Sequence, residues 1–146
     1  MGRGIKNVYD IAANIAIASS VAPVTTTLTS PIAAGGKQHL KWWVPFSVGA
    51  TGGVRAIVTV PVGGVIFLNT IKLVNTVAPS ITPASQTASA AFTNALANAG
   101  THWIEVEATI INGTTAGNVD LQMAQNTSDA LTLTILRGGT LDVTIY

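Results

Sequence analysis

The chain has 146 residues, which is the size of one domain. Only 9% of its residues are charged, 48% are hydrophobic, and the formal net charge is +1. This balance excludes a nucleic-acid binder that relies on a basic surface, and it excludes an intrinsically disordered chain. The absence of cysteine excludes disulfides, thiolate metal ligands and a cysteine nucleophile. Two histidines are too few for a multi-histidine metal site.

The sequence carries no convincing membrane or targeting segment. A transmembrane helix needs roughly 20 consecutive, mostly apolar residues. The best candidate, residues 54–68, is interrupted by Pro61 and by a pair of glycines. The apolar run over 11–22 has the general form of a signal peptide, but Asp10 and Asn14 argue against it. We therefore expect an N-terminal arm rather than a cleaved leader.

Residues 1–36 differ in composition from the rest of the chain. They are rich in small residues, threonine and serine, and they contain Pro23 and Pro31. Such a segment buries little surface by itself, which predicts an extended arm over 1–36 with at most a short helix around residues 7–18. Either the domain over 37–146 or a neighbouring chain would hold this arm. Its candidate protein-interface residues are Arg3, Lys6, Tyr9 and Ile11.

Apolar and polar residues alternate from Lys37 onward, which predicts a half-buried strand over 37–48. Pro45 lacks the backbone donor of a sheet ladder, so this strand is predicted to be at an edge or bulged. Two further strands are predicted over 54–62 and 65–74. The residues of the first strand that point to the predicted core are Leu40, Trp42, Val44, Phe46 and Val48, and those that point away are His39, Lys41, Trp43 and Ser47.

Residues 75–99 have an ambiguous pattern. The proline-containing first part indicates a loop. The alanine-rich part, 85–99, fits a short helix that ends at Gly100, or a weak strand anchored by Phe92 and Leu96. We predict a loop with one helical turn.

The last third of the chain alternates again over 101–111, 118–125 and 130–137, with a final strand over 140–146. The chain therefore has seven or eight short strands separated by glycine-rich turns, which predicts an all-β sandwich or barrel and argues against an α/β fold. The predicted inward residues are Ile104, Val106, Ala108, Ile110, Val119, Leu121 and Met123.

Few residues form a pattern that could carry chemistry. Glu105 and Glu107 share one side of a strand, and paired carboxylates can serve acid/base catalysis or bind a cation, but a solvated sheet face is the more typical reason. His102 is expected at a rim or core position. The sequons that begin at Asn112 and Asn126 are first of all turn sequences. We expect no catalytic residue, no metal site and no cofactor.

Trp42 and Trp43 are adjacent on a predicted strand, so one can be core while the other lies outside. An exposed Trp43 would mark a contact surface, whereas the arm or a second layer could also cover it. The scarcity of charges points the same way, because a soluble monomer usually carries more of them. We expect the chain to bury surface against copies of itself or another protein, with Trp43 and Trp103 as candidate interface residues.

Residues 101–146 carry a family resemblance. They resemble the C-terminal part of tailed-bacteriophage virion structural proteins, in which an aromatic residue precedes an I-E strand and an A-Q-N-T-S-D segment precedes a Gly-x-x-L turn. Gly138-Gly139 stands where that pattern usually has Gly-Ser, and the upstream VPFSVGATGGVR over 44–55 is also similar. The matching stretches are WIE over 103–105, GNVDLQ over 117–122, AQNTSD over 124–129 and RGGTL over 137–141.

The resemblance implies an antiparallel jelly-roll-like β-sandwich that often trimerises, and a structural role in the virion. The expected function is a capsid decoration (cement) protein without catalysis, made in the host cytoplasm and placed on the capsid exterior. Its expected partners are the major capsid protein and itself, as a homotrimer, with no nucleic acid and no membrane. The alternative is a tail-fibre, baseplate or receptor-binding module that recognises host-surface glycan through an exposed aromatic platform. An enzyme ranks third.

Overall fold

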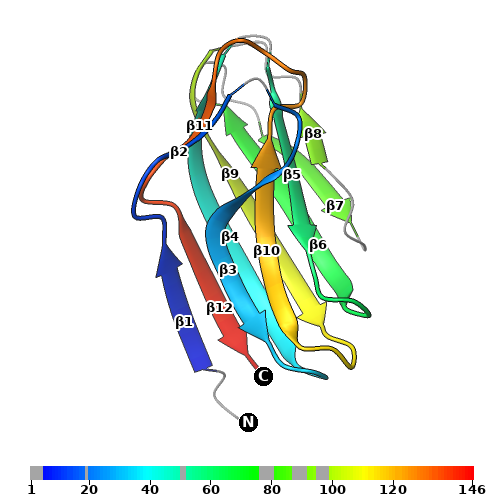
Figure 1. Ribbon diagram of the computed structural model, residues 1–146. Helices are drawn as coiled ribbons and strands as arrows, with labels where there is room; N and C mark the ends of the chain where they lie inside the picture. Colours follow the sequence, from blue (N-terminus) through cyan, green and yellow to red (C-terminus); the bar gives the residue numbers. More distant parts are fainter. Residues whose placement is uncertain (1–4, 19, 50–51, 76–80, 87–91, 95–98) are drawn as a thin grey trace.

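A computed structural model of the chain describes residues 5–18, 20–49, 52–75, 81–86, 92–94 and 99–146 (Figure 1). The described residues form antiparallel strands, as predicted. They contain no helix that is long and apolar enough to cross a membrane. The strands are β1 (Ile5–Asp10), β2 (Ile15–Ile17), β3 (Val24–Ile32), β4 (Lys37–Val48), β5 (Val54–Thr59), β6 (Val65–Asn75), β7 (Ile81–Gln86), β8 (Phe92–Asn94), β9 (Gly100–Ile111), β10 (Gly117–Ala124), β11 (Leu133–Ile135) and β12 (Thr140–Ile145).

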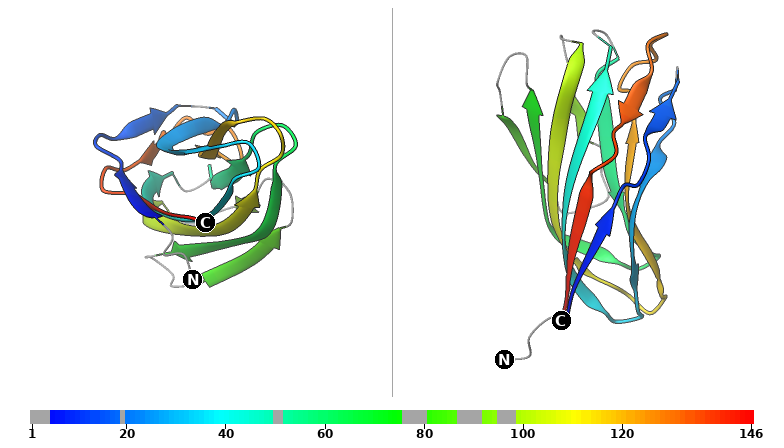
Figure 2. Two further views of the ribbon diagram at one scale, coloured as in Figure 1. Left: turned by 90° about the horizontal axis from the view of Figure 1, so that it is seen from below. Right: turned by 90° about the vertical axis from the view of Figure 1, so that its left-hand side faces the viewer.

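The strands build two sheets that face each other (Figure 2). The large sheet has the order β1-β12-β4-β9-β6-β7, and β11 joins it by pairing with β4 and β2. The small sheet has the order β3-β10-β5-β8. Pairing is nested along the chain, because β1 pairs with β12, β3 with β10, β4 with β9, and β5 with β8. A long hairpin rolled into two sheets in this way is a jelly roll, which confirms the predicted fold class.

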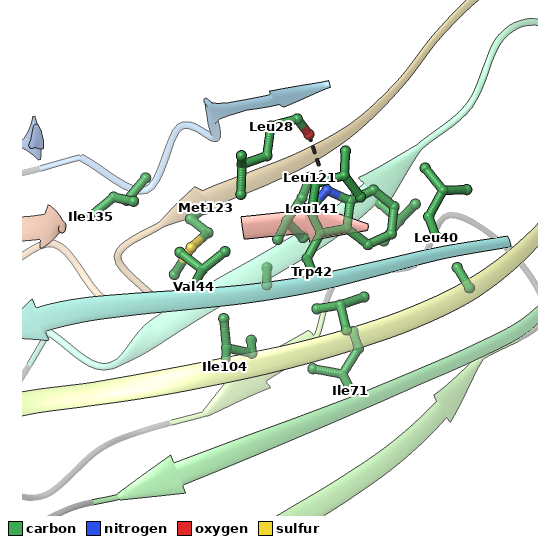
Figure 3. Packing of buried hydrophobic residues seen from close by; sticks show 14 of the residues in the cluster. Leu28, Leu40, Trp42, Val44, Ile71, Ile104, Leu121, Met123, Ile135 and Leu141 are labelled. Atoms are coloured by element: carbon green, nitrogen blue, oxygen red, sulfur yellow. Dashed lines mark hydrogen bonds between the residues drawn. The ribbon is translucent and has the colours of Figure 1, made fainter. Parts of the chain in front are cut away.

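The core lies between the two sheets (Figure 3). Every residue of β4, β9 and β10 that was predicted to point inward is buried, as the period-two pattern requires. Trp42 lies near the middle of this core, among residues such as Leu121 and Leu141 (Figure 3). Fully burying one aliphatic or phenylalanine side chain stabilises a fold by roughly 1.5–3 kcal/mol. The inward rows of β4, β9 and β10, which are buried, therefore contribute strongly to stability.

Three strands of the predicted arm, β1, β2 and β3, pair within the same chain. β1 lies along β12, β2 along β11, and β3 along β10. The domain therefore holds this segment, which was one of the two possibilities open from the sequence. Of the two alternatives predicted around residues 7–18, the extended chain is the one observed and the short helix is not, because β1 and β2 lie there, along C-terminal strands.

Ile11 attaches the segment after β1 to the turn that precedes β12. Its backbone N–H donates to the carbonyl of Gly139 at 2.8 Å, and its carbonyl accepts from the N–H of Gly138 at 3.0 Å. A Cβ on Gly139 would lie 2.7 Å from Cδ1 of Ile11, so the glycine leaves room for this side chain. Ile11 is only 3% exposed and belongs to the core.

Of the two alternatives predicted from Pro45, an edge strand or a bulged strand, the edge strand is wrong, because β4 lies between β12 and β9. β12 pairs with β4 up to Trp43, and β11 takes over at Phe46. The carbonyl of Pro45 points to this side, where it accepts from the N–H of Leu136 at 2.9 Å. The missing N–H of the proline therefore falls in the gap between two partner strands and interrupts neither ladder.

Two other boundaries differ from the prediction. The strand predicted over 54–62 ends at Thr59, and Val62 is 84% exposed in the turn that follows. The loop with one helical turn predicted over 75–99 is wrong where the structure describes that region, because β7 and β8 are strands. The remainder, residues 76–80, 87–91 and 95–98, lies outside the described residues.

A bulge in β3 frees a backbone carbonyl for the core. Thr29 pairs with Asp120 and Thr25 with Gln122, so β3 inserts extra residues at the point where Thr27 adopts a φ of 67°. The carbonyl of Leu28 then accepts the indole N–H of Trp42 at 3.0 Å (Figure 3). The bulge thus satisfies the polar atom of the largest core side chain.

We expect Thr27→Asn to raise the free energy of unfolding by about 1 kcal/mol, because asparagine tolerates a positive φ that strains a β-branched residue. Urea denaturation measures the change. Thr25→Asn, on the regular part of β3, is the matched control and should give no gain. Equal effects of the two substitutions would contradict the strain at Thr27.

Candidate interaction surface

The outward residues of β1, β12, β4, β9 and β6 form one surface, called here the outer face of the large sheet. The pairing registers of these strands place their outward residues side by side in rows across the sheet. Of the chain's 13 charged residues, eight share this face, which makes it the most polar side of the described structure. They are Lys6, Asp10, Lys37, Lys41, Lys72, Glu105, Glu107 and Asp142.

Glu105 and Glu107 each lie opposite a lysine on a neighbouring strand. Lys41 of β4 pairs with Glu107, and Lys72 of β6 pairs with Glu105. The Nε2 atom of His39 also lies 3.0 Å from Oε1 of Glu107. Opposite charges placed like this stabilise a sheet by roughly 0.2–1 kcal/mol a pair. The two glutamates therefore lie on a solvated sheet face, which was the more typical of the two readings.

Trp43 and Trp103 lie together in the middle of the outer face. Trp43 pairs with Glu105, and Trp103 pairs with Pro45, which makes the two tryptophans diagonal neighbours on β4 and β9. Their ring centroids are 6.3 Å apart, with an interplanar angle of 37°. Trp43 is 37% exposed while Trp42 is fully buried, so the adjacent tryptophans do face opposite sides.

We expect the exposed ring of Trp43 and the half-buried ring of Trp103 to be energetically coupled. A double-mutant cycle with Trp43→Ala and Trp103→Ala should give a coupling free energy of about 0.5–1.5 kcal/mol, as tilted aromatic pairs do beyond their buried area. Urea denaturation of the four proteins measures it. A coupling free energy of zero would mean that the two rings contact each other without stabilising the sheet.

The other predicted interface residues fall in different environments. Lys6 lies on the outer face, where its Nζ is 3.0 Å from Oδ2 of Asp142. Tyr9 packs against the core and Ile11 is part of it, so both contact the chain itself. Arg3 lies outside the described residues.

An apolar patch at one end of the large sheet was not found from the sequence. Val65 of β6 and Ile111 of β9 are paired there, and they are 48% and 38% exposed. Phe67 is 61% exposed, at the position where the register of β6 shifts. Tyr146 lies next to this patch, because its N–H donates to the carbonyl of Lys37, and Lys37 pairs with Ile111. The ring of Tyr146 is 5.2 Å from Nζ of Lys37. Simple alternation over the predicted strand groups Val65 and Phe67 with the buried Ile71 and Leu73. The register shift beside Phe67 reverses this, so the local pattern carried no signal for the patch.

Gln125, in the AQNTSD stretch, holds the loop that follows β10. The side chain is fully buried. Its Nε2 donates to the carbonyl of Leu131 at 2.6 Å, and its Oε1 accepts from the N–H of Asp129 at 3.0 Å. The backbone N–H of Gln125 also donates to the carbonyl of Ser20, which ties the N-terminal segment to the same loop. Gln125, one of the residues that carry the family resemblance, therefore has a structural role.

Asn112 and His102 are also buried. The Nδ2 of Asn112 donates to the carbonyls of Ala33 and Thr115, so the asparagine of the first sequon links two turns. His102 lies in the interior, 5.7 Å from the ring of Phe46, as expected for a core position. Among the described residues, no group of three or more His, Asp or Glu side chains could hold a metal ion.

The sequence matches no protein-family model and no curated protein. Among solved structures, it is similar to a chain from the structure of the Gx strain of infectious bursal disease virus, with 14% sequence identity and a TM-score of 0.24. The match covers 98% of this chain and 41% of that one. A likeness this distant bears on neither fold nor function.

Proposed function

We propose that this protein is a structural component of a virion, and that it decorates the capsid of a tailed bacteriophage as a cement protein. The observation that carries the proposal is the stretch over 101–146 that resembles phage virion proteins. Its motif residue Gln125 has a structural role in this fold, because it holds the loop that follows β10. Jelly rolls occur in viral capsid domains, which agrees with this reading as an analogy of fold alone.

The outer face of the large sheet is the surface we assign to the capsid. Trp43 and Trp103 lie on its two central strands, β4 and β9, and the opposed charges Lys41–Glu107 and Lys72–Glu105 lie beside them. Tryptophans at the centre of a contact, with a polar rim that excludes water, are typical of sites that carry binding energy. The major capsid protein would be the partner, on the capsid exterior, and no catalytic step is involved.

The mechanism is avidity across a lattice. Each subunit, as part of a homotrimer made in the host cytoplasm, would bridge neighbouring capsid proteins. Opening the lattice at one joint would then require several contacts to break together, because linked sites bind with a high effective concentration. Binding only to the assembled state also stabilises that state by mass action. The lack of cysteine suits folding in a reducing compartment.

The test is binding to capsids from which this protein has been removed. Wild-type protein should bind and raise the temperature at which the particles release their genome. Trp43→Ser should weaken binding by about ten-fold or more, as loss of a central tryptophan does. Ile57→Ser, on the outer face of the small sheet, is the control and should bind normally. Thermal unfolding of the free variants shows that both are folded.

Two outcomes would contradict the proposal. One is wild-type protein that binds no capsid. The other is normal binding by Trp43→Ser together with lost binding by Ile57→Ser, which would move the contact to the small sheet.

The tryptophan pair also favours a second candidate, a tail-fibre, baseplate or receptor-binding module that recognises host-surface glycan. The exposed ring of Trp43 and the half-buried ring of Trp103 lie beside Glu105 and Lys72, and they supply an apolar platform with polar groups at its border. Saccharide titration that changes the tryptophan fluorescence of wild-type protein, and not of Trp43→Ser, would support this candidate. A glycan array without hits would count against it.

A further inference from the structure

Among the described strands, β1 is an open edge of the large sheet. It pairs with β12 on one side and ends the strand order of the sheet (Figure 1). The N–H and carbonyl of Ile11 both point toward the turn before β12. Because these groups alternate in direction along an antiparallel strand, those of Lys6, Val8 and Asp10 point toward the open edge. Such an edge can pair with a further strand.

The sequence of β1 is self-complementary about Val8. In an antiparallel pair of two β1 strands with Val8 opposite Val8, Lys6 of each copy lies opposite Asp10 of the other. Both charges and Val8 point to the outer face, since they alternate with Asn7 and Tyr9. Val8 is 57% exposed between the two charges, and a second Val8 would cover it.

Shifting the centre of the pair removes this match. Centring it on Asn7 places Lys6 opposite Val8, and centring it on Tyr9 places Asp10 opposite Val8. Both shifts leave a charge facing an apolar side chain. The Val8-centred register is therefore the one that joins opposite charges and apolar surface at once.

We propose that β1 pairs with β1 of a second copy of this chain, antiparallel and centred on Val8, so that two large sheets become one continuous sheet. The contact is two-fold and symmetric, with the same residues on both copies. It goes beyond the capsid role, because it needs no virion partner. A two-fold contact cannot close a trimer, so on a lattice it would join copies from neighbouring trimers.

A cysteine placed at the centre of the pair tests the contact, because the chain has no cysteine of its own. Opposed hydrogen-bonded residues lie about 5.5 Å apart at Cα, within the range of a disulfide. Purified Val8→Cys should form an intermolecular disulfide under mild oxidation about ten-fold faster than Val62→Cys. Val62 is 84% exposed in a turn, so that control reports random collision.

Charge exchange tests the register in a Val8→Cys background. Lys6→Asp alone places two acids opposite each other, and Asp10→Lys alone places two lysines opposite each other, so each should crosslink slowly by itself. An equimolar mixture of the two proteins restores both opposite-charge pairs and should crosslink at about half the rate of Val8→Cys, because about half of the encounters join unlike proteins. The Lys6→Asp protein lacks the Lys6–Asp142 ion pair both alone and in the mixture, so the loss of that ion pair cannot explain the faster crosslinking of the mixture.

Equal crosslinking of Val8→Cys and Val62→Cys would overturn the proposal. So would a mixture no faster than its separate components, or Val8→Cys that crosslinks in particles to another protein and not to itself. All of these measurements use the chain as purified or in particles, so their failure leaves the capsid-binding test unaffected.

Discussion

Deleting residues 1–36 is expected to abolish folding rather than merely detach an arm. The deletion removes β1, β2 and β3, and with them Ile11, Ile17, Leu28 and Ile32 from the core. Each lost buried residue costs roughly 2–5 kcal/mol, while a domain is stable by only about 5–15 kcal/mol. Loss of the carbonyl of Leu28 also leaves the indole N–H of Trp42 without its acceptor.

Circular dichroism and thermal unfolding test this deletion. The truncated chain should show no cooperative transition. Deleting only residues 1–10 is the control: it removes the edge strand β1 but keeps Ile11 and β3, so this protein should remain folded with a lower melting temperature. A cooperative transition and native β-sheet signal from the chain that lacks 1–36 would show that residues 37–146 fold alone.

Gln125→Ala is expected to lower the free energy of unfolding by about 3 kcal/mol. The substitution leaves the N–H of Asp129 and the carbonyl of Leu131 without the buried side chain that bonds them. Each buried group that loses its partner costs roughly 1–3 kcal/mol. The loop between β10 and β11 should loosen first, because the same side chain holds both of its ends.

Urea denaturation measures the effect of Gln125→Ala. Gln122→Ala is the control, since Gln122 is half-buried on the outward side of β10, and we expect a change within about 0.5 kcal/mol. Similar losses for the two variants would contradict a specific role for Gln125. They would also remove the structural explanation of the AQNTSD stretch.

The central strands could be predicted because their inward residues are uniformly apolar. β4, β9 and β10 alternate without interruption, so period two identifies both the strand and its buried side. β3 has the same period, but Thr26 and Ser30 occupy two of its inward positions. Polar residues there, and the bulge at Thr27, hide the pattern, and the segment resembles an arm.

The candidate surface could be predicted only in part. The alternation of β4 places Trp43 outside, and that of β9 places Trp103 outside. That the two rings meet depends on the register between strands about 60 residues apart, which local pattern does not set. The same holds for the lysines opposite Glu105 and Glu107. The pairing of β1 with the last strand of the chain is a property of the rolled hairpin and left no local signal.

The copy number of this chain in purified virions tests the central claim most directly. Quantitative mass spectrometry against the major capsid protein measures it. The account predicts a lattice-wide ratio, close to one per capsid subunit or a fixed fraction such as one trimer at each joint between capsomers. Only a handful of copies per particle would contradict a cement protein and would favour the tail or receptor-binding reading.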